Sequence, residues 1–433
     1  MSALARFFAS KGVKISGYDR TRTPLCETLE NEGMAIHYDE DVNLIPSDID
    51  LVVYTPAIPK DNAEFVHLQN TKIPVLKRSE TLGLITQNML GVCIAGTHGK
   101  TTISTLLAHL LTQSSVKCNA FLGGIAKNYN SNLILSETSS IAVIEADEFD
   151  RSFLKLFPKV AVISSTDADH LDIYGDKKAL EKSFSDFANL VPNDGFLFQK
   201  YGTSNFGKPH KTYHLTDTNA DYYTTNLRSE NGVYAFDFHT PNFVWENLEM
   251  IYPGLHNVEN AVIATVVAHL LGATETEIRN GLRTFFGIKR RFDVHIKTEN
   301  LIYIDDYAHH PREIDACIKS VKNLFPNRKI TGIFQPHLYS RTRDFADDFA
   351  KSLSQLDALV LLDIYAAREK PIEGISSEFL LEKCTLPNKM LVEKSKVIDH
   401  LKTQPLDIVL TMGAGDIDQI VSPIIEHLHT NKK

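Results

Sequence analysis

The sequence lacks any long apolar run and any excess of positive charge. Its apolar segments fall short of the ~20 residues that a helix needs to cross a bilayer. Residues 1–12 do not form the apolar core of a signal peptide, because Arg6 and Ser10 interrupt them at helical spacing. The formal net charge of −9 argues against a general nucleic-acid or anionic-membrane binder, although a local basic pocket for phosphates is compatible with it. We therefore expect no nucleic-acid partner and no membrane partner.

The sequence is also poor in cysteine, with five in 433 residues. No two of them have the spacing of a metal finger or a redox pair, which predicts buried, reduced thiols in a cytosolic protein. Otherwise the composition, 43% hydrophobic and 23% charged, is that of an ordinary globular protein. The length corresponds to about two to four domains, and the oligomeric state is left open. The cysteines are Cys26, Cys93, Cys118, Cys317 and Cys384.

The first segment, residues 1–88, alternates short apolar strands with helices, a pattern typical of a parallel sheet covered by helices. The chain opens with an amphipathic helix whose Leu4, Phe7 and Phe8 we expect to face a sheet. The strand "VKISGYD" ends in Asp19, at the position where an acid commonly binds a ribose hydroxyl about twenty residues after a glycine-rich turn. We therefore predict that Asp19 binds substrate.

That glycine-rich turn and the strand before it are not in the sequence, which begins at the helix that should follow them. We expect about twenty residues, one strand and the turn, to be missing from this unit, through a misplaced start site or a truncation. The N-terminal sheet would then lack a central strand and expose unpaired backbone. Such a form should be less stable and should bind the ligand of this dinucleotide-type unit poorly.

A second unit, residues 89–287, begins with an apolar strand over 90–95, a glycine-rich turn and a helix. The strands "IAVIE" and "VAVIS" follow, each running into acidic residues, and residues 196–250 are richer in β-strand, with "GVYAFDFH" expected as an antiparallel strand. A helix over "HNVENAVIATVVAHLLGA" should end at Gly272.

The third unit, residues 288–433, has four candidate strands, "NLIYID", "RKITGIF", "ALVLLD" and "DIVLTM". Each is followed by a polar cluster, in order "DYAHH", "QPHLYSRTR", "IYAARE" and "GAGD". Open α/β sheets bind ligands at the carboxyl ends of their strands. The pattern therefore predicts a binding site along one edge of this sheet.

The strongest single motif is "GTHGKTT", residues 96–102, between a strand and a helix. Its glycines let the backbone approach a phosphate, and the helix N-terminus supplies N–H donors. The lysine is placed to hold the outer phosphates, and a threonine hydroxyl can reach magnesium. The loop is shorter than the standard phosphate loop, and a chance glycine turn is the alternative. The residues that we assign to phosphate binding here are Gly96, Thr97, His98, Gly99, Lys100, Thr101 and Thr102.

Acidic residues follow both strands next to this loop. Glu145 ends "AVIE", where an oxygen ligand could reach magnesium, and Asp147 and Glu148 continue the cluster. A second acidic cluster, "TDADHLD", follows the next strand. Its acids could simply stabilise the N-terminus of a helix. His170 in this cluster does not serve that purpose and could instead ligate a metal. We predict Thr101, Glu145 and His170 as metal-binding residues.

Three further stretches carry polar groups. "HNVEN" opens a helix, so His256, Asn257 and Asn260 either cap it or contact a nucleotide. "KRRFD", with Arg291, either contacts phosphate when domains close or forms a solvated face. "QPHLYSRTR" offers Arg341 and Arg343, whose planar guanidinium groups suit a carboxylate, so this loop is a candidate amino-acid pocket.

Together these stretches resemble the Mur ligase family of peptidoglycan synthesis over essentially the whole chain. The matching stretches, in order, are "MSALARF", "GTHGKTT", "EADE", "DADHLD", "GLHNVENA", "RRFD", "DDYAHHP", "FQPHLYSRTRDF" and "GAGDI". The resemblance implies an α/β protein of three domains. These are a Rossmann-like UDP-binding domain (1–88), a central P-loop ATPase-like domain (89–287) and a C-terminal Rossmann-like domain (288–433).

The resemblance is strongest to members that join L-alanine to UDP-N-acetylmuramate, and it implies ATP and Mg²⁺ as cofactors. ATP would phosphorylate the muramoyl carboxylate, and the amine of L-alanine would attack the acyl phosphate. The likeness places Lys100 on the β- and γ-phosphates and Thr101, Glu145 and His170 near magnesium. It places Asn260, Arg291 and Asp306 around the nucleotide, and Tyr307, His309, His337 and Arg341 by the substrates. Of these, Lys100, His309, His337 and Arg341 are the predicted catalytic residues.

Some alternatives stay open from sequence. A ligase for murein tripeptide shares the phosphate loop, and a nucleotide-binding protein without ligase activity could use the same fold. A folylpolyglutamate-type ligase is a weaker option, because it should lack the first domain. Leu338 stands where some family members carry an arginine, so a substrate carboxylate would depend on Arg341 or Arg343. His309 and His337 are candidates for the general base because of their residue type.

Overall fold

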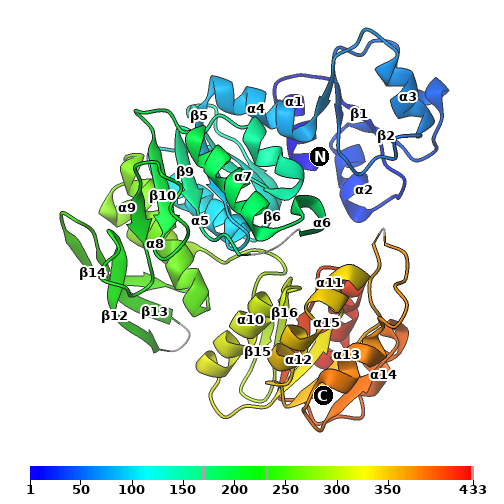
Figure 1. The fold of residues 1–433 in the computed structure, drawn as a ribbon, viewed down its shortest axis with the longest axis vertical. Coiled ribbons are helices and arrows are strands. Elements are labelled where there is room, and N and C mark those ends of the chain that lie inside the picture. The colour runs from blue at the N-terminus through cyan, green and yellow to red at the C-terminus, as the bar shows by residue number, and fades with distance from the viewer. Residues whose placement is uncertain (168–170, 231–232, 368, 431–433) are drawn as a thin grey trace. The chain divides into compact units, whose positions relative to one another are not determined.

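The computed structural model describes residues 1–167, 171–230, 233–367 and 369–430 (Figure 1). The chain divides into two compact units. The first unit comprises residues 1–227, 236–248 and 260–285, and the second comprises 228–235, 249–259 and 286–433. In the described part of the chain, we find no helix with the length and apolarity needed to span a bilayer. All five cysteines are buried free thiols, as the sequence predicted.

The N-terminal part of the first unit contains two short parallel ribbons rather than one sheet. Strand β1 pairs with β2, and β3 pairs with β4, without hydrogen bonds that join the two pairs. Thr23 caps α2 through its side chain, and Gly33 follows that helix with a φ of +92°. The elements are α1 (Ser2–Ser10), β1 (Ser16–Tyr18), α2 (Pro24–Asn31), β2 (Ala35–His37), β3 (Val52–Tyr54), α3 (Ala63–Gln69), β4 (Val75–Lys77) and α4 (Arg78–Asn88).

Helix α1 packs on the central sheet of the first unit. Leu4 is buried, and the ring of Phe7 lies edge-on to the ring of Phe121 at 5.3 Å. Asn132 donates a hydrogen bond to the hydroxyl of Ser2 at 3.1 Å. The predicted amphipathic helix is therefore confirmed, and the surface that it covers is formed by strands β6 (Asn119–Ala126) and β7 (Ser131–Ile134).

The central sheet has seven strands in the order β11-β10-β9-β5-β8-β6-β7. Strand β5 (Leu90–Ala95), which leads into the glycine-rich loop, lies between β8 (Ile141–Glu145) and β9 (Val160–Ile163) and is parallel to both. Among the described residues, β7 runs antiparallel to its neighbour β6, and the other neighbouring pairs of this sheet are parallel. The other elements are α5 (Lys100–Gln113), η2 (Phe149–Lys155), α6 (Leu171–Tyr174), α7 (Lys177–Asn189), β10 (Phe196–Lys200), β11 (Lys211–Tyr213) and α9 (Glu275–Thr284).

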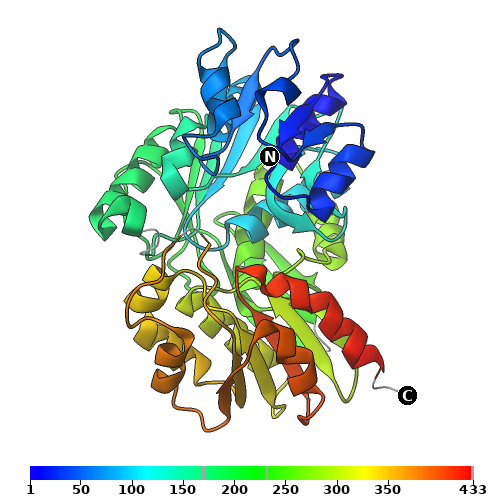
Figure 2. The same cartoon turned by 90° about the vertical axis from the view of Figure 1, so that its right-hand side faces the viewer.

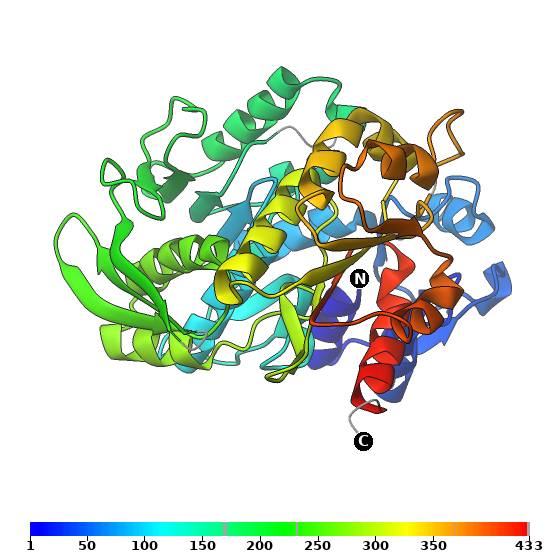
Figure 3. The same ribbon diagram turned by 90° about the horizontal axis from the view of Figure 1, so that it is seen from below.

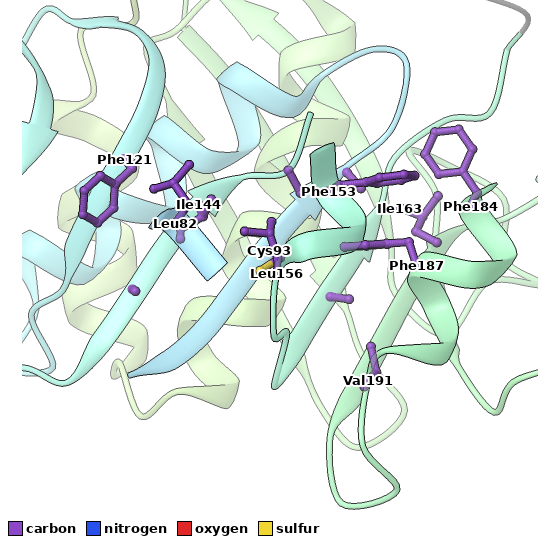
Figure 4. Packing of buried hydrophobic residues seen from close by; sticks show 14 of the residues in the cluster. Leu82, Cys93, Phe121, Ile144, Phe153, Leu156, Ile163, Phe184, Phe187 and Val191 are labelled. Atoms are coloured by element: carbon purple, nitrogen blue, oxygen red, sulfur yellow. The ribbon is translucent and has the colours of Figure 1, made fainter. Parts of the chain in front are cut away.

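One face of the central sheet is covered by α4, α7 and η2, and a dense aromatic core lies between them (Figure 4). Phe153 stacks on Phe187 with ring centroids 4.9 Å apart and meets the edge of Phe184 at 5.5 Å. Cys93, Ile144 and Ile163 contribute the sheet side of this cluster. Burial of apolar surface stabilises a fold by about 25 cal/mol per Å². This core therefore holds β5 in place, and β5 leads into the glycine-rich loop.

A three-stranded sheet, β12-β13-β14, precedes the long helix α8 (Leu255–Leu270). The predicted strand "GVYAFDFH" is the middle one, β13 (Val233–His239), between β12 (Tyr223–Glu230) and β14 (Val244–Met250). Gly272 has a φ of +107° just beyond α8, which fits the expected end of that helix.

The sheet of the second unit has the order β15-β16-β20-β17-β18-β19. The four predicted strands are four neighbours in it, namely β16 (Ile302–Asp306), β20 (Ile408–Met412), β17 (Ile330–Phe334) and β18 (Ala358–Leu361), all parallel. Their polar clusters therefore follow adjacent strand ends, as predicted. Two edge strands were not predicted, β15 (Asp293–Lys297), antiparallel to β16, and β19 (Lys389–Leu391).

Helices cover both faces of this sheet, which gives three layers (Figures 2 and 3). Alternate strand residues supply the two cores, so that Ile302 and Ile304 face one side and Tyr303 the other. The helices and short turns are α10 (Pro311–Leu324), α11 (Tyr339–Asp344), α12 (Ala346–Leu353), α13 (Ser377–Lys383), α14 (Val397–Leu401), η4 (Asp416–Ile420) and α15 (Val421–Thr430).

Candidate active site

The loop between β5 and α5 needs both of its glycines. Gly96 has a φ of +131° and Gly99 a φ of +84°, values that L-amino acids with a side chain rarely adopt. A Cβ atom on Gly96 would overlap the hydroxyl of Ser164, and one on Gly99 would lie 2.9 Å from Oδ1 of Asn260. The loop therefore passes close to its neighbours and delivers the N-terminus of α5, a helix of 14 residues, to the end of the sheet.

Lys100, the first residue of α5, is held by a buried carboxylate. Its Nζ donates to both oxygens of Glu148, at 2.9 and 2.7 Å, and to the carbonyl oxygen of Gly96 at 2.7 Å. The Glu148 side chain is fully buried. Burial opposes the charge on Lys100, but the carboxylates of Glu148, Asp147 and Glu145 outweigh it and raise the pKa of the ammonium group. Lys100 is therefore charged and faces the loop.

Thr101 and Glu145 form a pair of oxygen ligands beside the loop. Glu145 ends β8 opposite Ile94 of β5, and it accepts hydrogen bonds from Thr101 Oγ1 at 3.0 Å and from the N–H of Gly123 at 3.0 Å. Hydroxyl and carboxylate oxygens are the donors that magnesium prefers, and magnesium needs few protein ligands because it keeps water. The pair fits a magnesium ion. His170, the third predicted ligand, lies outside the described residues.

Thr97 and His98 anchor the loop to the end of β9. The hydroxyl of Ser165 lies 2.9 Å from Thr97 Oγ1 and accepts from the N–H of His98 at 2.8 Å. Thr97 Oγ1 in turn accepts from the N–H of Asp167 at 3.1 Å. These contacts join the middle of the loop to the segment that follows β9. Thr102 is buried within the first turn of α5.

The predicted residues of α8 have different surroundings. Asn260 lies beside Gly99, within the first unit and next to the loop. Asn257 is buried and donates from its side chain to the carbonyl oxygen of Pro253 at 2.5 Å, so it stabilises the turn before the helix. His256 lies 3.4 Å from the hydroxyl of Ser320, within the second unit. Nucleotide contacts by Asn257 and His256 stay predictions.

In the second unit, five side chains form a row across the strand ends. Arg291 lies over the ring of Tyr307 at 4.8 Å, and Tyr307 meets the ring of His309 at 5.2 Å. His309 lies 6.1 Å from His337, and His337 stacks on Tyr365 at 5.7 Å. The row brings together four residues that were predicted from three separate motifs.

Both histidines of the row are uncharged near neutral pH. Burial lowers the pKa of His309 to about 4, although Glu313 opposes this. Burial and the nearby charge of Arg341 lower the pKa of His337 to about 4. A neutral imidazole can accept a proton, so either ring is chemically suited to take one from an amine.

The "KRRFD" loop wraps around two buried acids at the end of β16. Asp306 accepts from the N–H groups of Phe292 at 2.6 Å and Ala308 at 2.7 Å, and burial raises its pKa to about 6. Arg290 donates to Asp305 at 3.1 Å and to the carbonyl oxygen of Gly413 at 2.7 Å. Arg290 is therefore engaged in holding the sheet ends together, while Arg291 lies over Tyr307.

The two arginines of the predicted carboxylate pocket differ. Arg341 lies half-buried on α11, near enough to His309 and His337 to lower the pKa of each. Arg343 is exposed and pairs with Asp344 at 2.7 Å. Leu338, just before α11, has a φ of +71°, which is strained for a residue with a side chain.

Comparison with known proteins follows the same order along the chain. The model for the Mur ligase middle domain matches residues 94–268, which contain the loop and α8. The glutamate ligase domain of Mur ligases matches residues 290–415, and the model described as the Mur ligase family catalytic domain matches residues 1–89. This chain belongs to the Mur ligase family.

Individual Mur ligases match over nearly the full length. A UDP-N-acetylmuramate–L-alanine ligase of Parabacteroides distasonis is 50% identical over 439 residues, which cover 99% of this chain and 95% of the relative. One from Porphyromonas gingivalis is 48% identical, with coverage of 99% and 97%. The crystal structure of the UDP-N-acetylmuramate-alanine ligase from Thermotoga maritima superposes with a TM-score of 0.83 at 25% identity, covering 100% of this chain and 97% of that one.

Several residues that contact these side chains were not predicted from the sequence. Glu148 was noted only as part of an acidic cluster, and Ser165, Asp305 and Tyr365 were not singled out. "SSTD" directly after β9 was a usable signal for Ser165, because that strand neighbours β5. Asp19, in contrast, lies exposed after β1, where its carboxylate accepts from the N–H of Thr21 at 3.0 Å. Its contact with substrate stays a prediction.

Proposed function

We propose that this chain is an ATP-dependent, ADP-forming ligase that joins L-alanine to the carboxylate of UDP-N-acetylmuramate in peptidoglycan precursor synthesis. The observation that carries the proposal is the near-full-length identity of up to 50% to ligases of this name. The charged Lys100 at a glycine-rich loop supports the ATP-dependent half of the reaction. The row from Arg291 to His337 supports the amide-forming half.

The reaction balances in two steps. The γ-phosphoryl group of ATP moves to a carboxylate oxygen of the muramoyl group, which releases ADP and forms an acyl phosphate. The amine of L-alanine then attacks the carbonyl carbon, loses a proton, and expels phosphate to leave an amide. Activation is needed because a free carboxylate is a poor electrophile, and the phosphate leaving group removes that difficulty.

The first unit serves phosphoryl transfer. Lys100 is positioned to neutralise charge on the outer phosphates of ATP, since transfer between two anions requires it. Thr101 and Glu145 would hold magnesium, with His170 as a third ligand. When bound, magnesium neutralises phosphate charge and orients the transferred group. Backbone N–H groups at the start of α5 would bind phosphate oxygens.

The second unit serves the amine. Arg341 is the candidate ligand for the carboxylate of L-alanine, because a guanidinium group binds a carboxylate through two parallel hydrogen bonds. His309 and His337 are the candidate acceptors for the amine proton, since both rings are neutral. Arg343 is a second candidate for that carboxylate. Arg291 and Asp306 are the candidate contacts for the nucleotide. In the first unit, Asp19 is the candidate contact for the UDP part of the substrate. The free, buried thiols fit a cytoplasmic location.

The test is phosphate release from ATP with UDP-N-acetylmuramate and magnesium, comparing L-alanine, glycine, L-serine and murein tripeptide. We expect release with L-alanine to exceed release with the other three. Release only with the tripeptide would replace this proposal by a tripeptide ligase, and nucleotide binding without release would indicate a binding protein. A solved murein peptide ligase of Psychrobacter arcticus shares the fold at 20% identity and a TM-score of 0.70.

A further inference from the structure

Tyr365 ends the row of side chains described above. It belongs to the polar cluster "IYAARE", which was expected at a binding edge of the sheet, but it was not itself predicted as a site residue. Its ring is nearly parallel to that of His337, with an angle of 22° and centroids 5.7 Å apart. The Tyr365 side chain comes from the segment after β18, whereas His337 follows β17, so the contact joins two neighbouring strand ends. About 36% of Tyr365 is exposed, so the ring is partly open beside the row.

The backbone of Tyr365 is fixed to both sides of His337. The N–H of Tyr365 donates to the carbonyl oxygen of Pro336 at 2.8 Å, and its own carbonyl oxygen accepts from the N–H of Leu338 at 3.0 Å. His337 and Tyr365 thus face each other in a parallel bridge. These two backbone hydrogen bonds hold the rings of His337 and Tyr365 next to each other without any hydrogen bond between the side chains.

A glycine makes this approach possible from the other side. A Cβ atom on Gly415, which follows β20, would lie 2.7 Å from the Cβ of Tyr365. That distance is shorter than van der Waals contact allows, so a larger residue would displace the tyrosine. Gly415 of the "GAGD" motif thereby leaves room for the Tyr365 side chain, which the sequence alone did not indicate.

His337 depends on stacking for its orientation. Its Nδ1 atom is buried and has no hydrogen-bond partner among the described residues. Its charged neighbours are Arg341 and Glu369. Glu369 is itself engaged, because it accepts from both the N–H and the hydroxyl of Ser340 at the start of α11. With Nδ1 unbonded, the His337 ring is positioned by its ring contacts with Tyr365 and His309.

We propose that Tyr365 is a positioning residue that holds the His337 ring in the orientation needed for the amine of the incoming amino acid. The inference rests on the proposed function, because it assigns His337 to the amide-forming step. The simpler alternative is that Tyr365 only packs the loop. The two explanations differ in whether the loss caused by removing the Tyr365 ring requires His337.

The experiment compares Tyr365→Phe, Tyr365→Ala, His337→Gln and the double variant Tyr365→Ala/His337→Gln in the full chain. Phosphate release is measured with L-alanine, UDP-N-acetylmuramate and ATP, and Tyr201→Ala, an exposed tyrosine of the first unit, is the matched control. We expect Tyr365→Phe and the control to keep normal kcat. Tyr365→Ala should lose about ten- to a hundredfold in kcat, with unchanged KM for ATP and for UDP-N-acetylmuramate.

The double variant separates the two explanations. If Tyr365 acts through His337, the double variant is no slower than His337→Gln alone. The His337 imidazole resonance, assigned by its loss in His337→Gln, should also titrate at higher pH in Tyr365→Ala, because water then reaches the ring. Unchanged turnover in Tyr365→Ala, or losses that multiply in the double variant, would overturn the inference alone. No L-alanine-dependent release by the unaltered chain would overturn the proposed function, and this inference with it.

Discussion

Glu148 holds the ammonium group of Lys100 between its two carboxylate oxygens, 2.9 and 2.7 Å from Nζ. The Glu148 side chain is fully buried and that of Lys100 nearly so, with 13% exposed. Lys100 also reaches the carbonyl oxygen of Gly96, at the start of the loop. The lysine is thereby kept charged and held against the start of the loop.

Replacement of Lys100 by alanine should abolish catalysis. We expect turnover to fall by at least about a hundredfold, because phosphoryl transfer loses the cation that neutralises its charge. ADP formation with all three substrates is the measurement, and circular dichroism checks that the fold remains. Lys178→Ala, an exposed lysine on α7, is the control that should stay active. Near-normal turnover of Lys100→Ala would refute its role.

Replacement of Glu148 by glutamine should destabilise the protein. The change leaves a nearly buried ammonium group without its counter-charge, and we expect a loss of about 3 kcal/mol in the free energy of unfolding. The double variant Lys100→Met/Glu148→Gln removes both charges and should lose less than the sum of the single variants. Urea unfolding of the four proteins gives these values. Additive losses would show that the two residues do not interact.

A methyl group at position 123 should weaken the use of magnesium. The Cβ of Gly123→Ala would overlap the carboxylate of Glu145 and push it away from Thr101. We expect the magnesium concentration for half-maximal turnover to rise about tenfold or more. Gly17→Ala is the matched control, because its Cβ would meet nothing within 4 Å. An unchanged magnesium requirement would remove Glu145 from the predicted metal ligands.

Buried His109 should make stability depend on pH. It lies on α5 and contacts Tyr129 Oη at 2.9 Å and Thr284 Oγ1 at 3.0 Å, and burial lowers its pKa from 6.5 to about 4. The neutral form is favoured in the folded state. Its contribution, roughly 3 kcal/mol, is therefore complete above pH 6.5 and is lost as pH falls from there toward 4.

Urea unfolding between pH 7 and pH 4 tests this dependence. We expect His109→Gln to show a flatter loss of stability over that range than the unaltered chain, because glutamine does not titrate. His67→Gln, at an exposed position of α3, should follow the unaltered chain. Parallel pH curves for His109→Gln and the unaltered chain would contradict the assignment.

The fold was predictable where apolar patterning was continuous. Residues 90–95 and the four parallel strands of the second unit were located correctly, because buried parallel strands read as apolar runs. Strands β15 and β19 were missed, since Asp293–Lys297 is largely polar and Lys389–Leu391 is only three residues long. The single N-terminal parallel sheet was also predicted, and two separate ribbons stand there instead.

The site was predictable from motifs where a residue directly follows a strand of the sheet. The loop glycines, Lys100 and the pairing of Glu145 with Thr101 followed from the position of each residue after a strand. The Lys100–Glu148 contact depends on a turn in which Asp150 and Arg151 both have a φ of +54°, which no sequence pattern signalled. Tyr365 is placed by the register between neighbouring strand ends, which a linear sequence does not contain.

The proposed acyl phosphate is tested most directly by following one oxygen atom of the muramoyl carboxylate. UDP-N-acetylmuramate labelled with heavy oxygen in its muramoyl carboxylate is incubated with ATP, magnesium and L-alanine, and the released phosphate is analysed by mass spectrometry. We expect each phosphate to carry one labelled oxygen and its release to require L-alanine, because the carboxylate oxygen leaves with the phosphoryl group. Phosphate free of label, or release that is independent of L-alanine, would contradict this expectation.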